Sequence, residues 1–168
     1  SITVTPTVST TTSMTVTIST IGTMTGGDQL TAVVTTNSVS SGSAVQVGTV
    51  TPVVTSSKVA ATSTTITIHG FGFDPVIAHD VLSLTNNGVA ISGTITVATA
   101  TSLTVTINSA VNPGTLSAAV SVNGSSSGVA VQVAAIQPVV TVNTAKLPAG
   151  ANSIVISGFG FDPNHAQN

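Results

Sequence analysis

Apolar and hydroxyl-bearing side chains alternate along much of this chain, and the alternation predicts short β-strands. In the clearest examples Val, Ile or Leu occupies one set of alternate positions and Thr the other, at residues 15–18, 65–68, 94–97 and 103–107. A period of two places the aliphatic side chains on one face of a strand, and Thr, Val and Ile favour extended backbone. Turn signals that contain Asn-Gly separate some of these stretches, at residues 86–88 and 123–124. The pattern therefore predicts half-buried antiparallel strands and almost no helix.

The pattern recurs at a nearly fixed distance along the chain. The hexapeptide Gly-Phe-Gly-Phe-Asp-Pro occurs at residues 70–75 and again 88 residues later at 158–163, and the two copies contain all four Phe residues. Residues 13–18 likewise match 102–107. A period of this length corresponds to a whole small β domain rather than to one turn of a solenoid. We therefore predict a tandem repeat of about 87 residues whose loops vary slightly in length.

One complete repeat contains seven predicted strands. They lie near residues 53–55, 65–69, 81–85, 95–98, 103–107, 116–122 and 129–133. Seven short strands separated by turns are typical of an immunoglobulin-like sandwich. Because the chain has no Trp and no Cys, we expect a core of Val, Ile and Leu. Its bulkiest anchors would be the Phe residues of the hexapeptide, Phe71 and Phe73 in one copy and Phe159 and Phe161 in the other.

The composition excludes several classes of function. The 168 residues include two Lys or Arg and four Asp or Glu, and 4% are charged, against about a quarter in ordinary soluble domains. Nucleic-acid binding is not expected, because it needs clustered basic residues or stacking aromatic rings. A membrane-spanning helix is not expected either, because hydroxyl groups interrupt every apolar run well before the roughly 20 residues that such a helix needs.

Several motifs together resemble a known family. Pro-Val-Val-Thr occurs at residues 52–55 and 138–141, an alternating strand then ends in Gly-Phe-Gly-Phe, and Pro-Gly-Thr-Leu follows at residues 113–116. This order is similar to that of the IPT/TIG immunoglobulin-like domains of bacterial surface proteins. The resemblance implies extracellular arrays of domains that act as stalks, adhesins or filaments. It also implies a structural role for the motif residues, which are Gly70, Phe71, Gly72, Phe73, Asp74, Pro75, Gly158, Phe159, Gly160, Phe161, Asp162 and Pro163.

The repeat divides the chain into three expected parts. Residues 51–137 form one complete immunoglobulin-like copy, residues 1–50 match the last part of a copy, and residues 138–168 match the first part of another. A stretch equivalent to residues 81–93 is represented in neither partial copy. The two partial copies are therefore complementary, so either the chain is an excerpt from a long covalent array or the tail of one subunit completes the head of the next. We predict that copies of the chain join head to tail as a linear homopolymer.

No catalytic or cofactor site is predicted. The chain has no nucleophile elbow of the Gly-X-Ser-X-Gly type and too few acids for paired catalytic carboxylates, so it is not expected to be an enzyme. Asp74, Asp80 and Asp162 are candidate calcium ligands, although Asp before Pro is also an ordinary turn initiator. The three His residues do not recur at matching positions, so a zinc site shared by the repeats is not expected.

Clustered hydroxyl groups suggest sites for glycans. Thr10, Thr11 and Thr12 could carry O-linked sugars, and Asn123 begins an Asn-Gly-Ser sequence that fits the N-glycosylation pattern. The alternative is that Thr occupies these positions because it suits exposed strand faces.

Two classes of function remain open at this point. The first is a structural protein of the cell surface or extracellular space, which forms a filament or stalk by head-to-tail joining of its domains. The second is an adhesin or carbohydrate-binding module of a bacterial surface protein. Carbohydrate platforms generally use exposed Trp or Tyr rings, and this chain has neither. The sequence therefore favours the structural class.

Overall fold

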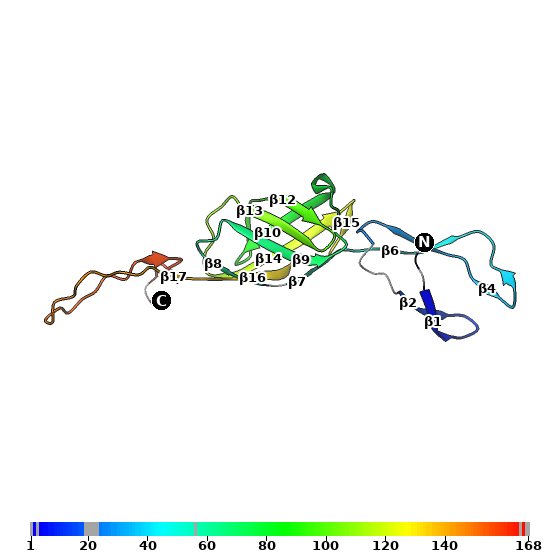
Figure 1. Cartoon of the computed structure of the whole chain (residues 1–168), viewed down its shortest axis with the longest axis horizontal. Coiled ribbons are helices and arrows are strands. Elements are labelled where there is room, and N and C mark those ends of the chain that lie inside the picture. The colour runs from blue at the N-terminus through cyan, green and yellow to red at the C-terminus, as the bar shows by residue number, and fades with distance from the viewer. Residues whose placement is uncertain (1, 3, 19–23, 56, 165, 167–168) are drawn as a thin grey trace.

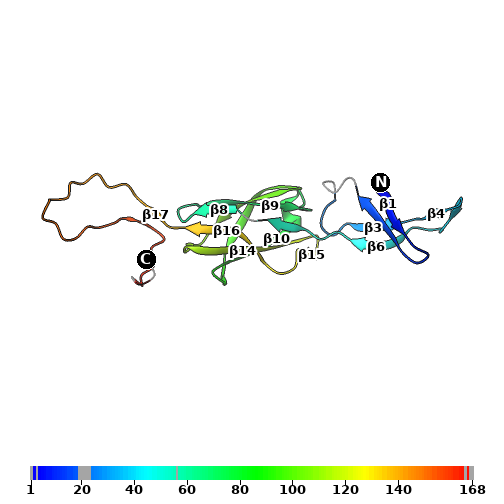
Figure 2. The same cartoon turned by 90° about the horizontal axis from the view of Figure 1, so that it is seen from below.

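The computed structural model describes residues 2, 4–18, 24–55, 57–164 and 166. The fold is nearly all β and is drawn out along one long axis (Figure 1). We divide it into a head (residues up to 50), a central sandwich (51–137) and a tail (from 138). The head and the tail lie at opposite ends of the central sandwich in both views (Figures 1 and 2).

The central sandwich consists of two facing sheets. The first has the strand order β12–β13–β9–β7, with β12 at Gly93–Thr99, β13 at Ser102–Ile107, β9 at Thr65–Phe71 and β7 at Val53–Thr55. The second has the order β11–β10–β14–β16–β8, and β15 (Ser125–Ser126) pairs with β14. Its members are β11 (Val89–Ile91), β10 (Asp80–Asn86), β14 (Gly114–Val122), β16 (Val131–Gln137) and β8 (Ser57–Ala60).

The buried apolar residues of the described chain all belong to this central sandwich. The first sheet contributes Ile66, Ile68, Leu103, Val105 and Ile107, and the second contributes Leu84, Leu116, Ala118, Val120, Val122, Val133, Ala134 and Ile136, with Phe73 between them. Along β9 and β13 every second residue is buried, which is the period expected from the sequence. The predicted all-β sandwich is therefore confirmed.

The two Phe residues of the first hexapeptide have different environments. Phe73 is fully buried, whereas Phe71 at the end of β9 is 50% exposed. Gly72 separates them with a φ of +78°, a left-handed conformation that shifts the alternation by one residue. The expectation that both rings anchor the core therefore holds for Phe73 only.

The seven expected strands of the central sandwich are all present, and three short ones were not expected. These are β8, β11 and β15. A 3₁₀ turn, η2 at Ile77–His79, precedes β10. Strand β8 pairs with β16 in parallel, and the other strand pairs of the sandwich are antiparallel.

Among its described residues the head forms three antiparallel strand pairs. Strand β1 (Val4–Ser9) pairs with β2 (Met14–Ile18), β3 (Gln29–Ala32) with β6 (Val45–Thr49), and β4 (Thr35–Thr36) with β5 (Val39–Ser40). Each pair has the same register as a pair of the central sandwich. The β1–β2 hairpin matches β12–β13 residue for residue and has its bulge at the same place, between Pro6 and Val8 and between Ile95 and Val97. Val4 is thus the counterpart of Gly93, so the stretch expected to be missing from both partial copies, 81–93, was placed too far toward its end.

The tail repeats the start of the central sandwich. Strand β17 (Val139–Val140) pairs with β18 (Gly158–Phe159) in the register in which β7 pairs with β9. The Thr141 hydroxyl donates to the Ser157 carbonyl at 2.9 Å, as the Thr55 hydroxyl does to the His69 carbonyl at 3.1 Å. Local pairing is therefore the same in the partial copies as in the complete one.

Candidate functional site at the joints between segments

The hexapeptide turn of the central sandwich lies directly against a turn of the head. The Gly26 N–H donates to the Gly72 carbonyl at 2.6 Å, so the backbones of the two segments are in contact. A second bond across this joint runs from the Ser125 hydroxyl to the Val50 carbonyl at 3.0 Å. We call this contact the head joint.

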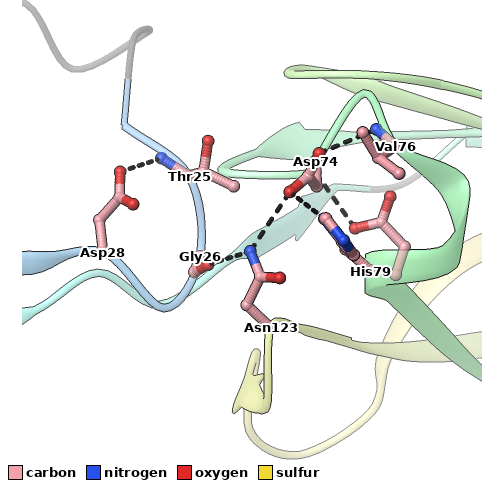
Figure 3. A network of polar contacts seen from close by, with 8 residues as sticks. Thr25, Gly26, Asp28, Asp74, Val76, His79 and Asn123 are labelled. Carbon is pink, nitrogen blue, oxygen red and sulfur yellow. Dashed lines mark hydrogen bonds and ion pairs between the residues drawn. The ribbon is translucent and has the colours of Figure 1, made fainter.

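Asn123 connects the two sides of the head joint (Figure 3). Its side-chain nitrogen lies 3.4 Å from the Gly26 carbonyl oxygen and 3.3 Å from Asp74 Oδ2, and it donates to both. Its backbone N–H donates to the His79 carbonyl at 3.0 Å. Asn123 itself has a φ of +50° in the turn between β14 and β15, a conformation that Asn tolerates better than most residues.

The carboxylate of Asp74 organises the central side of the joint. Its Oδ1 accepts the Val76 N–H at 2.8 Å, and its Oδ2 accepts the His79 Nδ1–H at 2.8 Å. The Val76 N–H, and after it the His79 side chain, stabilise the ionised form and hold the pKa of Asp74 below its ordinary value of 3.8. On the head side, Asp28 Oδ2 accepts the Thr25 N–H at 2.9 Å and closes the turn that holds Gly26 (Figure 3).

Asp80 lies behind this network at the start of β10. Its Oδ1 accepts the Asp74 N–H at 3.1 Å, whereas its Oδ2 is buried and has no hydrogen-bond partner. Burial disfavours the charged form and raises the pKa of Asp80 above 3.8. The two neighbouring carboxyl groups are therefore shifted in opposite directions.

The head joint is packed too closely for a side chain at Gly26. A Cβ atom there would lie 2.8 Å from the Val122 Cβ and 3.1 Å from both the Gly72 oxygen and the Pro52 Cδ. Carbon atoms in contact normally lie about 3.5–4.0 Å apart. The absence of a side chain at Gly26 is therefore what lets the two segments touch.

The second hexapeptide makes a comparable contact with the other end of the central sandwich, which we call the tail joint. A Cβ atom on Gly160, whose φ is +74°, would lie 2.8 Å from the Pro113 Cγ and 3.1 Å from the Ala61 Cβ. A cavity of about 840 Å³ lies beside this contact, between Asn87 and Asn112 on the sandwich and Phe161 and Pro163 on the tail.

The two joints use equivalent parts of the repeat. In the head joint, the second glycine of the hexapeptide, Gly72, faces the turn that precedes β3. In the tail joint, the equivalent Gly160 faces the turn that precedes β14. They differ in chemistry, because Asn112, which the strand registers make the counterpart of Gly26, donates its N–H to Asn86 Oδ1 at 2.7 Å within the sandwich. The tail joint at this point is a van der Waals contact.

The candidate calcium ligands are only partly brought together. Asp74 and Asp80 are adjacent, but Asp162 belongs to the tail, where its Oδ1 accepts the Asn164 N–H at 2.8 Å. Within the residues described here, no three His, Cys, Asp or Glu side chains are grouped so as to hold a metal ion. Calcium binding stays a prediction from the sequence.

The candidate glycan sites are exposed. Thr10, Thr11 and Thr12 form the tip of the β1–β2 hairpin, where the Thr10 hydroxyl lies 2.8 Å from the Ser13 hydroxyl. Asn123 is also exposed, but a glycan on it would be attached to the same nitrogen that donates to Gly26 and Asp74. At Asn123 the head joint and a glycan therefore compete for one group.

The sequence did not reveal that His79, Asn123 and Gly26 meet at one joint. Gly26 and Asn123 are 97 residues apart, and their contact depends on how two segments dock rather than on a local pattern. The one sequence feature that could have indicated this contact is turn chemistry, since Gly26 lies in a Gly-rich turn and Asn123 begins an Asn-Gly turn.

Comparisons with known proteins give no relative for this chain: no family model, no curated protein and no solved structure matches it. In the part of the chain that the structure describes, no helix has the length and apolar character needed to span a bilayer. Arguments about function therefore rest on the fold and on the two joints.

Proposed function

We propose that this chain belongs to a structural protein of the cell surface or extracellular space, in which immunoglobulin-like domains are joined end to end as a filament or stalk. The repeat supplies length, and the joints fix how one domain follows the next. The IPT/TIG-like motifs of the sequence agree with this role.

The strand order supports an immunoglobulin-like classification. In the lettering of that fold, the first sheet reads D–E–B–A and the second reads C′–C–F–G. The parallel pairing of β8 with β16 adds the early strand of the domain to its last strand. The predicted repeat is further supported by the registers that the head and the tail share with the central sandwich.

The single observation that carries the proposal is the recurrence of the joint. A protein whose domains only need to be tethered can use a flexible linker. Here the hexapeptide turn contacts the preceding segment in both places where the repeat provides one. We infer that the hexapeptide is a docking element, and that it makes the array stiff.

The uncharged surface fits the same role. With 4% charged residues the surface offers few specific contacts to charged partners, and its many Ser and Thr hydroxyl groups offer positions for sugars. Glycans on the Thr-rich hairpin tip at residues 10–12 would keep such a surface soluble.

The proposal is tested by loosening the head joint. Gly26→Val places a branched side chain against Val122 and Pro52, so the head should separate from the sandwich at this edge. Small-angle X-ray scattering from dilute protein should give one extended shape for the unmodified chain. For the variant it should give a broader distribution of interatomic distances, because the head then samples many orientations.

Gly150→Val is the matched control. Gly150 lies in the tail, and a Cβ atom there would have no neighbour within 4 Å. Its scattering curve should be that of the unmodified chain. A chain that is already flexible before substitution, or a Gly26 variant that scatters like the control, would contradict a stiff array.

A further inference from the structure

The head and the tail each leave apolar strand faces uncovered. In the head, the faces of β1–β2 and β3–β6 enclose a cleft of about 840 Å³ whose lining includes Met14, Val16, Leu30 and Val47. In the tail, Ile154 and Ile156 are 68% and 60% exposed. Such surfaces are typical of interfaces rather than of free solvent-facing strands.

The central sandwich contains the same two surfaces packed against each other. Its β13 is the counterpart of β2, and the edge of β13 that faces away from β12 pairs with β9. In this pairing Leu103 lies opposite Ile68 and Val105 opposite Ile66. The tail residues Ile154 and Ile156 occupy the repeat positions of Ile66 and Ile68, counted back from the shared Gly-Phe-Gly-Phe. Both of those Ile residues are buried in the core.

The chain therefore carries an unpaired strand edge in the head and an unpaired segment of matching pattern in the tail. The β1–β2 sheet has two strands, and residues 151–157 form no ladder in the described structure. Neither the β2 residues 14–18 nor the tail residues 153–157 include a charged side chain, so no repulsion or buried charge opposes their contact.

We infer that residues 153–159 of one copy of the chain add to the free edge of β2 in a second copy, in the register in which β9 pairs with β13. This places Met14 opposite Ile156, Thr15 opposite Val155 and Val16 opposite Ile154. Strand β17 stays paired with β18, so the completed sheet has the order of β12–β13–β9–β7. Phe161, the counterpart of the buried Phe73, enters the apolar cleft of the head.

The occupant is a second copy rather than the tail of the same chain. The head and the tail lie at opposite ends of the molecule with the central sandwich between them (Figures 1 and 2). Joining of this kind is heterologous and does not close on itself, so it extends a line of subunits. Strand β3 is the counterpart of β14, which pairs with β10 in the central sandwich. The tail provides no counterpart of β10, so this edge of β3 receives no strand from it.

This inference rests on the proposed end-to-end array and names its partner and register. Disulfide trapping tests it directly, because the chain has no cysteine of its own. Full-length chains with Thr15→Cys are mixed with full-length chains with Val155→Cys under mild oxidation. The two positions are directly opposite in the inferred register, within the range that a disulfide can bridge.

The register control pairs Thr15→Cys with Ser157→Cys. Residue 157 lies on the same face but two positions away, beyond the span of a disulfide. The yield of the mixed dimer should be lower by on the order of tenfold than with Val155→Cys. Equal yields for the two mixtures, or no mixed dimer in either, would overturn the inferred register.

A second pair of variants tests burial without new cysteines. Ile156→Asp would place a carboxylate inside the completed sandwich, whereas Val155→Asp would leave it on the outer face. Analytical ultracentrifugation should show association weakened on the order of 100-fold by Ile156→Asp and little changed by Val155→Asp. If the unmodified chain remains monomeric at high concentration, the inference is overturned. The free edge of β2 would then be covered by a neighbouring repeat of a longer polypeptide instead of by a second copy.

The two proposals fail separately. If scattering shows a stiff molecule but trapping shows no register preference, the array stands and the joining of two copies does not. If trapping succeeds but the unmodified chain is flexible in dilute solution, the joining stands and the stiff array does not.

Discussion

Strands β2 and β13 have almost the same sequence and different surroundings. Ser-Met-Thr-Val-Thr-Ile in the head and Ser-Leu-Thr-Val-Thr-Ile in the central sandwich form hairpins of identical register. Leu103 and Val105 are nevertheless fully buried, whereas Met14 and Val16 are 44% and 40% exposed. The difference shows that the hairpin is determined locally by turn chemistry and alternation, whereas burial requires the larger facing sheets of the central sandwich and is not reached by the two-stranded sheets β1–β2 and β3–β6.

The largest test of this comparison uses the two matching Phe residues. Phe73→Ala removes a fully buried ring and should lower the free energy of unfolding of the central sandwich by about 3–5 kcal/mol. Phe161→Ala removes a ring that is 42% exposed and should lower it by less than about 0.5 kcal/mol. Urea denaturation followed by far-UV circular dichroism measures both, and equal losses would show that the tail is as well packed as the sandwich.

A smaller effect distinguishes the two matching aspartates by pH. The lowered pKa of Asp74 means that its contribution to stability is fully present above pH 3.8 and is lost as the pH falls through its folded-state pKa. In Asp74→Asn the sandwich should no longer lose this part of its stability when the pH is lowered. In Asp162→Asn the sandwich should lose it as the unmodified chain does, and acid denaturation measures both.

Asp80 supplies an internal check on that experiment. Because burial raises its pKa, its contribution is present below pH 3.8 and is lost as the pH rises through its folded-state pKa. In the Asp74→Asn background this opposite slope should become visible. Stability that still falls on acidification in that background would assign the acid sensitivity to a different group.

The smallest expected effect concerns a feature in which the head hairpin β1–β2 and the sandwich hairpin β12–β13 should behave alike. Thr10 and Thr99 occupy the same turn position, and each accepts a backbone N–H three residues later at 2.9 Å, from Ser13 and Ser102. Thr10→Ala and Thr99→Ala should each lower the free energy of opening of the turn by about 1 kcal/mol. The amide that loses its acceptor should then exchange roughly fivefold faster. Hydrogen exchange followed by NMR compares the two, and a response in the sandwich alone would show that the hairpin depends on its surroundings.

Much of the sandwich could be predicted because its strands alternate. The expected strand at 53–55 coincides with β7, and the one at 65–69 lies within β9. Strands β11 and β15 contain three and two residues, too few for a period to be recognised, and no recurring motif marks them as Pro-Val-Val-Thr marks the equally short β7. Phe71 was misplaced because Gly72 changes the phase of the alternation, and a left-handed glycine cannot be recognised from composition alone.

The joints were less predictable for a different reason. Asp74 was recognised only as a turn residue and candidate calcium ligand, and its contact with Asn123 joins positions 49 residues apart. A contact of this kind depends on the three-dimensional closeness of two turns, which a single sequence does not encode in any local pattern. The repeat itself was visible, and it indicated which turns would be equivalent.

The parallel pairing of β8 with β16 has a mechanical consequence. Strand β8 follows the connection to the head and the short strand β7, and β16 precedes the connection to the tail. Four residue pairs join β8 and β16, from Ser57–Ala134 to Ala60–Gln137. Tension applied along the chain pulls these two parallel strands in opposite directions along their length. Their hydrogen bonds are then loaded in shear and must break together rather than one after another, so the sandwich resists stretching at the point where the load enters and leaves it.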